Sequence, residues 1–112
     1  MTSQGSAHRR FTRAVAQKNV ASAEVAAKEM GGLSLLDALD YVLLLVEVRP
    51  ERFEPAAIRW HGRFEVESVG LTLSEAHLAL AVLGDLCNEP ESAAVLKRLL
   101  RRARPTLIPQ PR

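Results

Sequence analysis

Residues 32 to 46 read GLSLLDALDYVLLLV, and this stretch carries the main helix signal of the chain. Ser34 is followed three positions later by Asp37, which is the spacing of a capping box. In such a box the hydroxyl accepts a hydrogen bond from a free backbone N–H, and the acid reaches back to the cap residue. The apolar run after the box contains Asp40 as well, and it is shorter than the roughly 20 residues that span a membrane. We therefore predict a helix capped by Ser34, and we expect no membrane span.

The same arrangement returns thirty-eight positions later, where residues 70 to 84 read GLTLSEAHLALAVLG. Thr72 and Glu75 form the second box, with the glutamate that such boxes prefer. A proline-containing turn and an amphipathic segment follow each apolar helix, so the repeated unit is a helix pair, 34–68 and then 72–103. Helix-pair repeats stack into arrays. We predict an all-α fold of five or six helices, as stacked antiparallel helical hairpins in a small repeat-like array.

The N-terminal part, 8–30, fits either one helix or two helices separated by a cap at Asn19, and its apolar periodicity leaves both open. A glycine pair at 31–32 ends it in either case. The chain of 112 residues has the size of one domain. We expect residues 1–6 to be disordered, 7–104 to form a single all-helical domain, and 105–112, which contains three prolines, to be an extended tail.

The composition favours a core of Leu, Val and Ala, because aromatic residues make up only 4% of the chain. Cys87 is the single cysteine, so no internal disulfide can form, and a reducing cytoplasm fits best. It falls on an apolar face of its helix and is expected to be a small buried residue. Arginine outnumbers lysine twelve to three, which is typical of a GC-rich and therefore bacterial genome.

No pattern in the sequence predicts catalysis. Histidines His8, His61 and His77 are not spaced as metal ligands on one helix, and no glycine-rich phosphate loop is present. The best acid cluster is formed by Asp37, Asp40 and Tyr41. It lies on the polar stripe of its helix, where a carboxylate is solvated rather than tuned for acid–base chemistry. We expect no enzyme activity, no cofactor and no metal.

The helix expected from Glu54 to Ser68 has two apolar stripes on nearly opposite sides. One contains Trp60 and Phe64, and the other contains Ile58, Gly62 and Val66. The second stripe is either covered by a later helix or offered to a partner. Leu44 and Val48 interrupt a polar stripe on the preceding helix in the same way. The residues predicted to contact a protein partner are therefore Leu44, Val48, Ile58, Gly62 and Val66.

Charge is unevenly distributed. The segments 1–18 and 97–112 contain no acid, while 19–96 holds all thirteen acids and has a net charge of −8. The basic ends are either solvated faces or binding sites for an anionic partner. The candidates are Arg9, Arg10, Arg13, Lys97, Arg98, Arg101, Arg102 and Arg104.

The sequence thus favours a small cytoplasmic helical protein that acts as an interaction or adaptor module, with an unidentified protein partner or a second copy of itself. The alternative is an accessory protein that binds nucleic acid through its basic first and last helices. Such binding would weaken strongly with salt. Against it, the basic segments carry no Tyr or Trp on which bases could stack.

Overall fold

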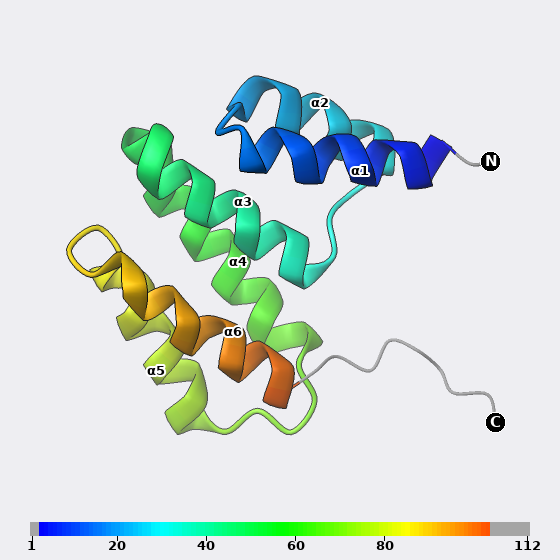
Figure 1. Ribbon diagram of the computed structural model, residues 1–112. Coiled ribbons are helices and arrows are strands. Elements are labelled where there is room, and N and C mark those ends of the chain that lie inside the picture. Colours follow the sequence, from blue (N-terminus) through cyan, green and yellow to red (C-terminus); the bar gives the residue numbers. More distant parts are fainter. Residues whose placement is uncertain (1–2, 104–112) are drawn as a thin grey trace, which may run out of the picture. The chain divides into compact units, whose positions relative to one another are not determined.

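The structure is a computed structural model that describes residues 3–103, and all of its regular structure is helical (Figure 1). Within the described residues it contains six α-helices and two short 3-10 helices, so the predicted all-α class is confirmed. The contacts divide the chain into two compact units, 1–54 and 55–112. None of the described helices is both long and apolar enough to cross a membrane.

Unit 1 contains three helices, α1 (Ser3–Ala16), α2 (Val20–Met30) and α3 (Leu35–Val48), followed by the 3-10 helix η1 (Pro50–Arg52). The open question about its N-terminal part is answered, because the chain turns between α1 and α2. Lys18 has a positive φ of 60° at this turn. Asn19 caps α2, its side chain accepting from the Ser22 N–H at 3.0 Å.

Helix α1 begins at Ser3, whereas the sequence predicts disorder through residue 6. Ala7 is fully buried, and Phe11, one turn later, is 1% exposed. Because both side chains belong to the core, they anchor the first turn of the helix. The polar composition of the first residues contains no signal for this burial. Residues 105–112, the predicted tail, lie outside the described residues.

The start of α3 follows the prediction in one half of its capping box. The Ser34 hydroxyl accepts from the Asp37 N–H at 3.1 Å. The Asp37 carboxylate does not complete the box; it lies 3.2 Å from Nε2 of His8 on α1. An aspartate is one methylene shorter than the preferred glutamate, and here it links two helices of unit 1 instead.

Unit 2 contains most of α4 (Phe53–Glu67), then α5 (Leu73–Asp85), the 3-10 helix η2 (Pro90–Ser92) and α6 (Ala93–Arg102). The second capping box is complete. Thr72 Oγ1 accepts from the Glu75 N–H at 3.1 Å, and the Glu75 carboxylate accepts from the Thr72 N–H at 3.0 Å. Arg102 of α6 also pairs with Glu75, which joins the end of α6 to the start of α5.

Helices α5 and α6 pack against each other and run in opposite directions, so the second predicted helix pair is a hairpin (Figure 1). Leu83, Leu86, Leu96 and Leu100 are buried in unit 2. The first predicted pair, 34–68, spans the division between the two units, and its pairing remains a prediction, as does a single domain over 7–104.

Candidate interaction surface

Helix α4 has the two apolar faces that its sequence predicts. On one face Trp60 is 2% exposed and Phe64 is fully buried, and their rings stack with centroids 5.1 Å apart. Ala57 is buried on the same face. This face belongs to the core, and an aromatic pair of this kind contributes about 1 kcal/mol beyond the burial of its area.

The opposite face of α4 is exposed. Ile58 is 62% exposed and Val66 is 84% exposed, and Val69, just past the helix end, is 58% exposed. Gly62 lies between the first two, and a Cβ atom built on it would meet no atom within 4 Å. Of the two alternatives, coverage of this stripe by a later helix does not occur, and the stripe is available for contact.

Helix α5 extends this surface. His61, on the side of α4 that faces α5, is 9% exposed, and its Nε2 donates to the Ala76 carbonyl at 2.8 Å. The two helices run in opposite directions (Figure 1). In such an antiparallel pair, residues that are rotated by a similar angle about their helix axes from His61 on α4 and from Ala76 on α5 lie on the same side of the two helices. On α5 those positions are Leu73, which is 91% exposed, and Leu80, which is 46% exposed.

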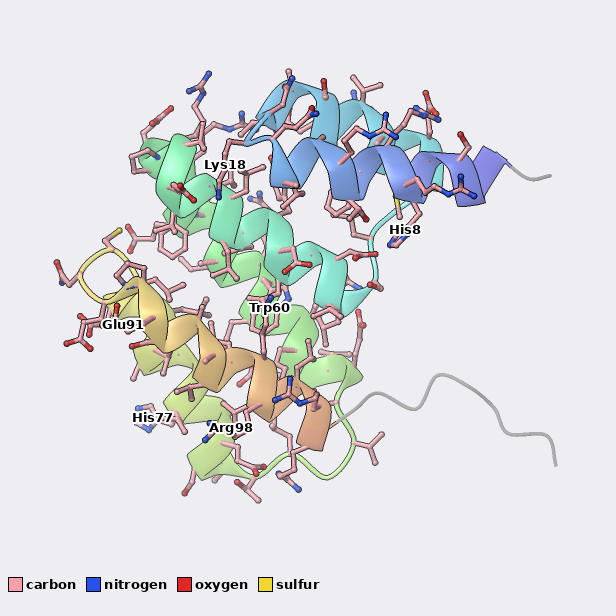
Figure 2. All side chains as sticks on the ribbon, in the orientation of Figure 1. His8, Lys18, Trp60, His77, Glu91 and Arg98 are labelled. Carbon is pink, nitrogen blue, oxygen red and sulfur yellow. The ribbon has the colours of Figure 1, made fainter. Side chains whose placement is uncertain are left out.

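We call these residues together the α4–α5 apolar surface. Arg59 and Glu65 lie at its two edges on α4; both are exposed, and neither forms an ion pair with the described part of unit 2. His77 on α5 is exposed, as expected of a surface histidine, and points away from the helix (Figure 2). The members of the surface are Ile58, Gly62, Val66, Val69, Leu73 and Leu80.

Two sequence-based expectations are corrected by burial. Leu44 is 3% exposed and belongs to the core, so it is not a partner contact. Its position within a polar stripe is misleading because α3 buries more of its circumference than the stripe suggests. Cys87, expected to be buried on the apolar face of its helix, is exposed, because α5 ends at Asp85 and Cys87 lies in the turn that follows. Val48, the other candidate on α3, is partly exposed.

The predicted basic residues lie in both units, and two of them form ion pairs within the protein. Arg10 forms an ion pair with Glu29, and Arg102 forms one with Glu75. The hydrogen bonds from the two arginines favour the ionised carboxylates and hold the pKa of each glutamate below its ordinary value. The remaining exposed candidates are Arg9, Arg13, Arg98 and Arg101. Lys97 is partly buried, and Arg104 lies outside the described residues.

Unit 1 contains a groove that the sequence did not indicate. Its volume is about 550 Å³, and Val25 of α2 and Leu33 line its apolar part. At its polar end Tyr41 and Arg52 both donate hydrogen bonds to the Glu24 carboxylate. The pKa of Glu24 is lowered, first by the Tyr41 hydroxyl and then by Arg52.

Sequence patterns do not reveal the groove, because Glu24 and Arg52 stand far apart in the chain and belong to no motif. Helical periodicity groups Tyr41 with the acids of its own helix, although its hydroxyl reaches a carboxylate on α2. The internal pairing neutralises both charged groups of the cluster, so the groove offers no unpaired charge from these two residues to a ligand. The groove therefore supports a binding function less strongly than the α4–α5 apolar surface does.

Among residues 3–103, no group of three or more His, Cys, Asp or Glu side chains is arranged to hold a metal ion. No protein-family model matches the chain, and comparison with curated proteins and with solved structures found no match.

Proposed function

We propose that the protein is a small helical interaction module that binds a protein partner through the α4–α5 apolar surface. The observation that supports this is the exposure of Ile58, Val66 and Leu73, which are large apolar side chains on adjacent helices. Scattered apolar residues are normal on a protein surface, but a contiguous group is typical of a contact site. The cytoplasmic location and the non-enzymatic role inferred from the sequence belong to the same proposal.

The arrangement suits this role because α4 is anchored on its other side. Trp60 and Phe64 hold one face in the core, and His61 ties the helix to α5 by a buried hydrogen bond. The exposed residues are therefore presented on a backbone that does not need to reorganise when a partner binds. A preorganised surface loses less conformational entropy on association.

Nucleic-acid binding receives less support. Two of the candidate cations, Arg10 and Arg102, are engaged by carboxylates. Arg98 and Arg101 remain exposed on α6, and Arg9 and Arg13 remain exposed on α1, so the observation that favours this alternative is the presence of exposed arginines in both units. A salt titration of binding to duplex DNA and to RNA distinguishes it, since phosphate contacts weaken steeply as salt rises.

The proposal is tested with immobilised chains that carry Ile58→Asn and Val66→Asn. Each is expected to keep the helical circular dichroism and melting transition of the unaltered protein, and to lose proteins that the unaltered chain retains from extracts of its host. Val25→Asn is the matched control, because Val25 is 56% exposed on α2 of unit 1 and lies outside the proposed surface. Unfolding of both α4 variants, or retention equal to that of the control, would count against the proposal.

A further inference from the structure

The α4–α5 apolar surface continues onto the connection between the two helices. Val69, on this connection, is 58% exposed, and Leu73, the first residue of α5, is 91% exposed. Apolar side chains of this size gain free energy when another segment removes them from water. This end of the surface therefore favours a cover that starts close by.

Helix α6 ends beside the same connection (Figure 1). Arg102, its last residue, donates a hydrogen bond to the Gly70 carbonyl at 3.5 Å and pairs with Glu75 of α5. Ala103 is 1% exposed, so the chain belongs to the core of unit 2 up to this residue. The residues that follow, 104–112, lie outside the described residues, and we call them the C-terminal segment.

The C-terminal segment has the composition of an apolar strap. Its sequence is RPTLIPQPR, in which Leu107 and Ile108 are neighbours and have prolines on both sides. Each proline fixes its own φ angle and so restricts the free chain. A restricted segment loses less conformational entropy when it docks than a flexible one does.

The length of the segment is sufficient for the apolar pair to reach the exposed connection. A proline-rich chain rises about 3.1 Å per residue, so Leu107 can lie up to roughly 12 Å beyond Ala103. The Arg102 side chain already contacts the Gly70 carbonyl, and Val69 is the residue before Gly70. The pair can therefore lie over this end of the surface.

The charge of the segment suits this position. It contains Arg104 and Arg112 and no acid. Glu65 follows His61 by four residues and so lies on the edge of the exposed α4 stripe that faces α5. Its side chain is exposed and forms no ion pair within the described part of unit 2. An arginine of the segment can pair with this carboxylate while the apolar pair is docked.

We propose that Leu107 and Ile108 dock on the Val69 and Leu73 end of the α4–α5 apolar surface of their own chain, and that a protein partner displaces them. The proposal rests on the proposed function, because it concerns access to the same surface. A short tether keeps the local concentration of the segment high. The apparent affinity for a partner then falls in proportion to the fraction of chains whose surface is uncovered.

Nuclear Overhauser effects between methyl groups of the full chain test the docking. Contacts are expected from Ile108 to Val69 and Leu73, and they should arise within single chains when labelled and unlabelled chains are mixed. The absence of these contacts overturns the proposal. Contacts that arise only between different chains also overturn it, because the occupant would then be a second copy.

The displacement is tested with immobilised full chains and the host proteins that the unaltered chain retains. The chain with Leu107→Asn and Ile108→Asn should retain about twofold more or better, since the gain equals the reciprocal of the uncovered fraction. The matched control carries Thr106→Asn and Gln110→Asn in the same segment and should retain as much as the unaltered chain.

Unchanged or reduced retention by the Leu107 and Ile108 variant overturns the displacement. The proposed function fails separately, when the Ile58 and Val66 variants retain as much as Val25→Asn. The methyl contacts of the C-terminal segment do not depend on that outcome, so the two failures are distinguishable.

Discussion

His61 on α4 donates a hydrogen bond from Nε2 to the backbone carbonyl of Ala76 on α5, at a distance of 2.8 Å. The imidazole is 9% exposed, and its ring lies 6.3 Å from that of Phe64. This contact joins α4 to α5, and it marks the sides on which the two helices face each other. In the neutral ring the proton is on Nε2, because the carbonyl can only accept.

Replacing His61 with alanine is expected to lower the free energy of unfolding by about 1–3 kcal/mol, since it removes a buried donor and leaves a cavity. His77→Ala is the matched control on α5, where the side chain is exposed, and it should stay within about 0.5 kcal/mol of the unaltered protein. Urea denaturation followed by circular dichroism measures both. Equal losses for the two variants would show that the His61 contact does not stabilise unit 2.

Gly62→Ala is expected to stabilise the folded monomer by about 0.5–1 kcal/mol, because alanine is the better helix former and the added methyl meets no neighbour. The same change should weaken binding of a partner to the α4–α5 apolar surface, because the added methyl keeps the partner further from the α4 backbone. Urea denaturation measures the stability, and retention of host proteins by the immobilised chain measures the binding. Gly70→Ala is the contrasting control, since its φ of 73° strains any side chain and should cost stability. A destabilised Gly62→Ala monomer would contradict the open space at this position.

Acid is expected to destabilise unit 1 through Glu24. The folded-state pKa of this carboxyl is lowered by hydrogen bonds from Tyr41 and Arg52. Its contribution to stability is therefore fully present above the unfolded pKa of about 4.3 and is lost as the pH falls through the lower folded value. The melting temperature should fall as the pH is lowered from about 5.

The Glu24→Gln variant should show a weaker dependence of the melting temperature on pH. It should be less stable than the unaltered chain at pH 7 and nearly as stable as that chain at the acid end of the range. The difference is expected to be modest and to shrink with salt, because the pair is partly exposed. Glu89→Gln, at an exposed glutamate on the loop before η2, is the control and should leave the slope unchanged. An unchanged slope in Glu24→Gln would contradict the assigned role of the cluster.

The helices were predictable because their ends are marked by local chemistry. Asn19, Ser34 and Thr72 each accept a hydrogen bond from the backbone N–H three residues later, and glycine precedes the caps at Ser34 and Thr72. Such contacts involve residues that are neighbours in the sequence, so the pattern of residue types is sufficient to find them. The two opposite apolar stripes of α4 were found in the same way, from the rotation of about 100° per residue.

Burial was less predictable, because it depends on which face a neighbouring helix covers. Leu44 is buried within an apparently polar stripe, while Cys87 is exposed because α5 ends two residues before it. The Glu24–Arg52 contact joins residues 28 positions apart and has no local pattern. For the candidate surface, the sequence pattern of α4 was sufficient to predict Ile58, Gly62 and Val66. The contribution of Leu73 on α5 was not predictable, because it depends on the contact between His61 and α5.

The central claim is that the exposed face of α4 is a contact surface for a protein partner, and retention of host proteins by the immobilised chain tests it most directly. The unaltered protein and Val25→Glu should retain the same proteins, whereas Val66→Glu, which would bury a charge at the proposed contact, should lose them while keeping its helical circular dichroism. A folded Val66→Glu chain that retains these proteins as readily as the unaltered protein would contradict the claim.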